Sequence, residues 1–145
     1  MRVYQLYLVK EEFAAQYFGK EIKFYRLFKE YADSQGEQKE ILLKQINFII
    51  EPISENELRT YIKKYFHENT HFYQQDGCYL IKDGNRSGAK LEIFPKHLVL
   101  KAKGNYYAET VFFEALRKFE HSFLAVDLDN QNFGWLRPIK TRKFV

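Results

Sequence analysis

The stretch YQLYLVKEEFAAQYFGKE, residues 4–21, decides the architecture of this chain, because it joins a strand-like run to a short helix. Residues 3–9 alternate loosely between apolar and polar types, which predicts a β-strand. Glu11 and Glu12 suit the positive N-terminal end of a helix, and we expect Gly19 to end that helix. The chain therefore begins with a strand that leads directly into a helix.

Two ridges of side chains run along this first helix. Phe13 and Tyr17 are four residues apart, and so are Ala14 and Phe18, which separates the two ridges by roughly 100° around the helix axis. A short amphipathic helix usually buries one ridge. We expect Ala14 and Phe18 to face the sheet, and Phe13 and Tyr17 to lie near the surface as anchors for a protein partner. The alternative is that all four side chains belong to the core.

A second and a third helix are predicted over residues 21–32 and 37–50, separated by a turn, with Pro52 closing the third. The apolar stripes of these helices are Phe24, Leu27, Phe28 and Tyr31 in one, and Leu42, Ile46, Ile49 and Ile50 in the other.

The third helix carries another stripe beside its core stripe. Ile41, Gln45 and Phe48 follow one another at spacings of four and three residues. A long amide next to an exposed ring is typical of a protein contact patch. The alternative for Phe48 is a place in the core.

The rest of the chain predicts a fourth helix and a set of antiparallel strands. Ser54 and Glu57 match a capping box for a helix that reaches about Phe66. Strands are predicted at residues 70–74, 78–82, 89–94 and 97–101, followed by a helix at 105–119 and a hairpin of residues 122–127 and 133–136. Tyr107, Val111, Phe112, Leu116 and Phe119 are expected to point from that last helix toward the core. The predicted fold class is α+β: one domain, residues 1–145, with a mainly antiparallel sheet covered by an N-terminal group of helices and one later helix.

Two motifs resemble catalytic signatures without fulfilling them. His67-Glu68-Asn69-Thr70-His71 satisfies H-E-x-x-H, but we expect the fourth helix to end there, so the two imidazoles would not share a helical face. Residues 84–90, GNRSGAK, have the wrong spacing for a phosphate loop and predict a hairpin turn. A single cysteine, Cys78, excludes an intramolecular disulfide. We therefore predict a protein that is not an enzyme and has no cofactor and no metal.

Composition points to protein binding more than to nucleic acid or membrane. The net charge is +4, too small to indicate a dedicated nucleic-acid-binding protein. No run of 18 apolar residues is present, so we expect no membrane-spanning segment. Aromatic residues make up 18% of the chain, more than one domain of this size is expected to hide, which favours an aromatic interaction surface.

Several separated blocks of the sequence resemble the SirA family, the sporulation inhibitor of replication of endospore-forming bacteria. They are residues 4–21, KQINFIIEPI at 44–53, YYAETVFFEALRK at 106–118 and FGWLRPIKTRKFV at 133–145. The resemblance implies a small cytoplasmic protein that binds the N-terminal domain of the replication initiator DnaA and blocks new rounds of initiation at the onset of sporulation.

The composition and the family resemblance together lead to one prediction and one alternative. The prediction is an inhibitor of replication initiation, monomeric on its own and without direct nucleic-acid or membrane binding, whose partner-binding residues are Phe13, Tyr17, Gln45 and Phe48. The alternative is a nucleic-acid-binding module that uses the basic C-terminal tail with nearby rings. That tail contains Arg137, Lys140, Arg142 and Lys143.

Overall fold

The structure is a computed structural model, and it describes residues 1–137 of the chain. Helices occupy Glu11–Gln16 (α1), Ile22–Asp33 (α2), Gly36–Ile49 (α3), Glu55–Tyr65 (α4) and Tyr107–Phe119 (α5). Strands occupy Arg2–Leu8 (β1), Phe72–Gln75 (β2), Cys78–Asp83 (β3), Ser87–Ile93 (β4), Leu98–Gly104 (β5), Phe123–Asp127 (β6) and Asn132–Trp135 (β7). The α+β class predicted from the sequence is confirmed.

The seven strands form one sheet in the order β2-β3-β4-β5-β1-β6-β7, and every pairing in it is antiparallel. The first strand of the chain therefore lies inside the sheet, between β5 and β6. Leu6 illustrates this position, because it pairs with Leu98 on one side and with Ala125 on the other. A strand in this position has no free edge, so its hydrogen bonds fix the sheet from both sides.

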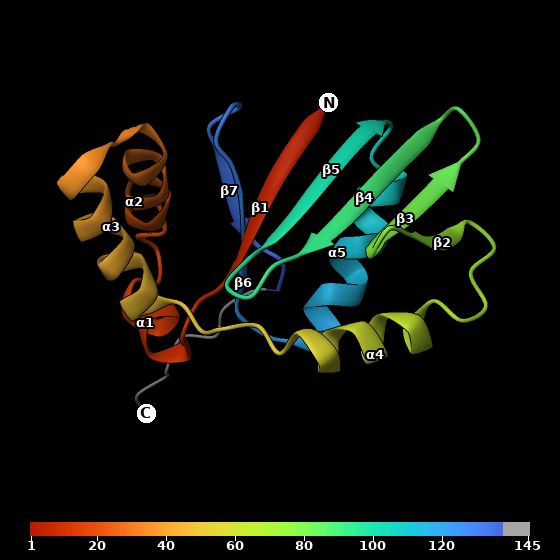
Figure 1. The fold of residues 1–145 in the computed structure, drawn as a ribbon, viewed down its shortest axis with the longest axis horizontal. Helices are drawn as coiled ribbons and strands as arrows, with labels where there is room; N and C mark the ends of the chain where they lie inside the picture. Colours follow the sequence, from red (N-terminus) through yellow and green to blue (C-terminus); the bar gives the residue numbers. More distant parts are fainter. Residues whose placement is uncertain (138–145) are drawn as a thin grey trace.

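Alternating side chains of β1 enter two separate cores, one on each face of the sheet. Helices α4 and α5 pack on one face, while α1, α2 and α3 pack on the other face near β1, β6 and β7 (Figure 1). Phe112 of α5 is fully buried in the first core. In the second core Phe28 of α2 stacks on Tyr7 of β1, with ring centroids 3.9 Å apart.

The predicted hairpins are present, and the β2–β3 turn shows why. Asp76 has φ 51° and Gly77 has φ 77°. Two consecutive positive φ angles are the mark of a two-residue hairpin turn whose twist matches the twist of the strands, and Asp-Gly is among the sequences that adopt it most readily.

Two local predictions were wrong. Ser54 does stand at the N-cap of α4, but its side chain makes no capping hydrogen bond, so the capping box is not formed. Tyr107 was predicted to face the core and is 41% exposed. It is the first residue of α5, where the Asn105 side chain accepts a hydrogen bond from the Tyr107 N–H, and its ring lies against His71 at the surface.

None of the helices in residues 1–137 has both the length and the apolar character that a membrane crossing requires.

Candidate protein-binding surface

Backbone hydrogen bonds place the start of α1 beside the end of α3. The Lys10 N–H donates to the Ile49 carbonyl at 2.9 Å, and the Glu51 N–H donates to the Leu8 carbonyl at 2.7 Å. Val9 and Ile50 form an isolated antiparallel bridge between these two bonds. The segment that leaves β1 is therefore held against the segment that leaves α3, so the first residue of α1 lies close to the last residue of α3.

This junction brings together two rings that the sequence placed on separate helices. The centroids of Phe13 and Phe48 are 5.3 Å apart, with the ring planes inclined at 59°. Phe48 remains 65% exposed, and Phe13 is half-buried. The Lys10 ammonium lies 5.4 Å from the centroid of Phe48. The ring pair thus has a supported inner side and an outer side that faces solvent.

Tyr17 continues this surface at the end of α1. It is half-buried, because its ring packs edge-on against the buried ring of Phe24 with centroids 5.3 Å apart. Lys23 places its ammonium 5.8 Å from the Tyr17 centroid. Tyr17 is therefore fixed on one side by the core and retains accessible area on the other.

Gln45 is exposed and stands one turn before Phe48 on α3. Ile41, one further turn back on the same face, is 56% exposed. We call Phe13, Tyr17, Gln45 and Phe48 the aromatic patch; Ile41 extends it, although it was not among the predicted binding residues. Its signal was in the sequence, since the 41, 45, 48 spacing already formed a stripe.

The prediction for Phe18 was wrong. It was expected to accompany Ala14 toward the sheet, and it is 48% exposed, whereas Ala14 is buried. The helix α1 ends at Gln16, and the chain then turns through Tyr17 and Gly19, which has φ 79°. The four-residue ridge that relates Ala14 to Phe18 exists only while the helix continues, so Phe18 leaves the buried side.

A hydrogen-bonded support lies behind Tyr17. The Glu21 carboxylate accepts hydrogen bonds from the Gly19 N–H at 3.0 Å and from the Trp135 indole N–H at 3.2 Å. Trp135 also packs edge-on against Phe24. Desolvation acts to raise the pKa of Glu21, but hydrogen bonds from its own backbone, Trp135 and Gly19 outweigh it and lower the pKa. The turn after α1 is thereby tied to the last strand of the sheet.

Exposure alone does not single out the aromatic patch. Other exposed Phe and Tyr rings in residues 1–137 belong to Phe18, Tyr65, Tyr73, Phe94, Tyr106 and Tyr107. What distinguishes the patch is that rings from two helices meet across a backbone junction, with lysines beside them. Of its three rings, that of Phe48 is mostly exposed, and those of Phe13 and Tyr17 are partly buried with some area left accessible.

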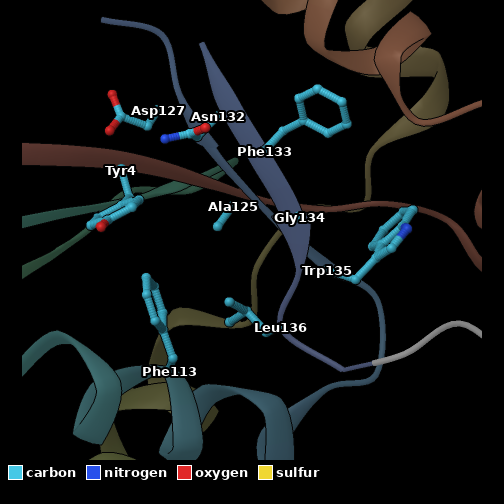
Figure 2. A pocket seen from close by; sticks show the side chains of 9 residues that line it. All are labelled: Tyr4, Phe113, Ala125, Asp127, Asn132, Phe133, Gly134, Trp135 and Leu136. Atoms are coloured by element: carbon cyan, nitrogen blue, oxygen red, sulfur yellow. The ribbon is translucent and has the colours of Figure 1, made fainter. Parts of the chain in front are cut away.

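An apolar recess lies on the opposite face of the sheet, between β1, β7 and α5 (Figure 2). It has a volume of about 290 Å³. Phe113 and Tyr4 meet there edge to face at 5.2 Å, and Gly134 contributes no side chain. The buried Asp127 carboxylate at its margin already accepts two hydrogen bonds from Asn130. A small recess with its carboxylate satisfied offers little to a ligand, so we do not place the function there.

The motifs that resembled catalytic signatures do not assemble a site. His67 lies in the turn after α4, and His71 lies just before β2 with its Nε2 3.7 Å from Asp83, so the two histidines do not share a helical face. Residues 84–86 form the β3–β4 turn, as predicted. Within residues 1–137, no three His, Cys, Asp or Glu side chains gather as a metal site would require. Lys140, Arg142 and Lys143 of the basic tail lie outside the described residues.

The fold and this surface define the class: a small α+β protein on one seven-stranded antiparallel sheet, with an exposed ring pair on two adjoining helices. Comparison with known proteins narrows this class to one family. The family described as "Sporulation inhibitor of replication protein SirA" matches residues 2–140. The sporulation inhibitor of replication protein SirA of Bacillus subtilis (strain 168) is 38% identical over 147 aligned residues, which cover 99% of each chain. This chain therefore belongs to the SirA family, and the resemblance drawn from separate sequence blocks is confirmed.

Proposed function

We propose that this protein inhibits the initiation of DNA replication during early sporulation by binding the N-terminal domain of DnaA through the aromatic patch. The family description supports the inhibitory role. The observation that carries the choice of surface is the contact between Phe13 and Phe48, which builds one anchor from two helices and leaves Phe48 65% exposed. The family name describes a regulator of replication, and an enzymatic activity has no support in the described residues.

The patch has the physical properties of a binding hot spot. Such sites are rich in aromatic side chains that lose their remaining water on binding. Phe13 and Tyr17 are already packed on one side, so ordering them in a complex costs little additional entropy. Gln45 supplies a donor and an acceptor beside the rings, which gives direction to an otherwise apolar contact. Inhibition then follows from occupancy: a bound protein covers a surface that DnaA needs to assemble or to load other factors at the origin.

The test is a binding titration of the purified chain with the DnaA N-terminal domain. We expect Phe13→Ala, Tyr17→Ala and Phe48→Ala each to weaken the complex by about 30-fold or more, equivalent to about 2 kcal/mol. Leu43→Ala is the matched control. Leu43 is a 40% exposed apolar residue on the same helix as Phe48, roughly 140° away around the axis.

Unchanged affinity in the Phe13 and Tyr17 variants would remove the patch from the interface. A loss in Leu43→Ala equal to that in Phe48→Ala would show that the Phe48 variant acts through α3 as a whole. Failure of the unmodified chain to bind the DnaA domain at all would overturn the identity of the partner.

A further inference from the structure

The outer face of strands β3, β4 and β5 is not covered by any helix in residues 1–137. Along these strands the side chains alternate: Ile81, Leu91 and Leu100 enter the core shared with α4 and α5. Their sequence neighbours point to the other side of the sheet. The helices α1, α2 and α3 reach that other side only near β1, β6 and β7 (Figure 1). A sheet face of three strands is thus open to solvent.

Four lysines stand on this open face. The register places Lys90 directly opposite Lys101, and Gly88 opposite both Lys82 and Lys103. On these three strands one carboxylate shares the face, that of Glu92, and its Oε1 lies 3.1 Å from the Lys101 Nζ. Like charges directly opposite on neighbouring strands destabilise a sheet. Glu92 compensates the charge of Lys101, so the positive charge left on this face is that of Lys82, Lys90 and Lys103, and it suits a negatively charged ligand.

The lysines surround a hollow of about 540 Å³, which is within the range of ligand sites. Gly88 forms part of its floor, because the missing side chain leaves room between Lys82 and Lys103. Leu80 and Tyr73 complete an apolar margin.

A ring lies in line with the lysine pair. Tyr73, Leu80, Lys90 and Lys101 are successive cross-strand partners, so they form one row across β2, β3, β4 and β5. Tyr73 is 41% exposed and stands two strands from Lys90, a distance of about 10 Å. Several modules that bind single-stranded nucleic acid use an open sheet face of this kind, on which bases stack on accessible rings while basic side chains contact the phosphates.

We infer that the open face of β3, β4 and β5 binds single-stranded nucleic acid, with phosphates at Lys82, Lys90 and Lys103 and a base on Tyr73. An acidic peptide would use the lysines but would leave the ring without a stacking partner. This site is separate from the aromatic patch, and it differs from the tail-based alternative considered for the sequence. It departs from the expectation of no direct nucleic-acid binding, which rested on the small net charge and on the lack of a broad basic stripe along the sequence. Neither feature reports that four lysines from three strands share one face.

The test measures binding of the full chain to a fluorescent oligothymidylate of about 10 nucleotides, within the usual site size of such surfaces. We expect the logarithm of the association constant to fall with the logarithm of salt concentration with a slope of about −2.1, about 0.7 for each of Lys82, Lys90 and Lys103, because the charge of Lys101 is already paired with Glu92. The variant Lys90→Gln/Lys103→Gln is expected to bind at least about tenfold more weakly, and the magnitude of its salt-dependence slope should be smaller by about 1.4. Tyr73→Ala is expected to weaken binding with little change of slope.

Two further variants serve as controls, and each removes two positive charges, as Lys90→Gln/Lys103→Gln does. Lys63→Gln/Lys64→Gln removes two exposed lysines of α4, on the covered side of the sheet, and should bind normally. Arg137→Gln/Lys140→Gln tests the tail. Binding of the DnaA domain and an unchanged Tm show that the sheet variant is folded.

Absence of oligonucleotide binding at low salt would overturn the inference. So would retained binding in the sheet variant, or a loss confined to the tail variant. Equal binding by a polyglutamate peptide of the same charge would also overturn it, since the face would then read charge without the base.

Discussion

Phe13 of α1 and Phe48 of α3 lie with their ring centroids 5.3 Å apart, although the two residues belong to helices separated along the chain by the whole of α2. The junction of Lys10 with Ile49 fixes this distance through the backbone, so the ring pair exists in the free protein.

A double-mutant cycle should detect that pair in the complex. We expect the binding losses of Phe13→Ala and Phe48→Ala to be non-additive by about 0.5–1.5 kcal/mol, the usual worth of an aromatic pair beyond its buried area. Calorimetric titration of the single and double variants with the DnaA domain measures the coupling. Because Phe48 is mostly exposed, its truncation should change the free energy of unfolding by no more than about 0.5 kcal/mol. Strict additivity would mean that the two rings act independently.

The two cores should unfold together. Phe28 is 1% exposed in the core beneath α2, and Phe112 is 0% exposed in the core beneath α5. We expect Phe28→Ala and Phe112→Ala each to lower the free energy of unfolding by about 3–5 kcal/mol. Because β1 contributes side chains to both cores, each variant should still show one cooperative transition in urea. A biphasic transition for either variant would show that the two faces are separable units.

The ion pair between Arg2 and Glu109 should stabilise the folded protein at the start of β1. Glu109 is 2% exposed and accepts a hydrogen bond from the Arg2 Nε at 2.8 Å, and this hydrogen bond raises the pKa of Arg2. Arg2→Met leaves a buried carboxylate without its cation, and because Arg2 is partly exposed we expect a loss of about 1–3 kcal/mol. Chemical denaturation measures it, and Arg2→Met/Glu109→Leu should recover most of the loss. No recovery in the double variant would refute this account.

Lowering the pH should weaken the hydrogen bonds that the Glu21 carboxylate accepts from Gly19 and Trp135. The pKa of Glu21 in the folded protein lies below its ordinary value of 4.5, since the hydrogen bonds that it accepts favour the ionised form. Its contribution to stability is therefore complete above pH 4.5 and is lost as the pH falls through the lower folded-state pKa. Trp135, the single tryptophan, reports this change through its fluorescence. Glu21→Gln should remove that titration; its persistence in the variant would assign it to another group.

Sequence patterns predicted most of the elements, because local signals determined them. Pro52 and the Asp76-Gly77 dipeptide act within a few residues of themselves, and the run of β-favouring residues at 89–94 lies between two turn signals. The errors arose where a pattern depends on a boundary. Phe18 left the buried ridge because α1 is shorter than predicted, and Tyr107 is exposed because it begins its helix.

The sequence likewise predicted the residues of the candidate site but not how they come together. Spacing along α1 and α3 predicted Phe13, Tyr17, Gln45 and Phe48 as two separate stripes. Whether those stripes meet depends on the bridge between Val9 and Ile50, which joins residues far apart in the chain and has no local signal. The lysines of the open sheet face had no local signal either. They come from three different strands, and only the strand order and register bring them together.

The sequence by itself determined the kinds of element, their order and the family, since propensity, turn chemistry and apolar spacing act over a few residues. Only the tertiary structure decided that β1 lies inside the sheet, that Phe13 touches Phe48 and that four lysines share one face. Those relationships depend on hydrogen bonds and packing between distant segments, and the free energy that selects them belongs to the whole fold.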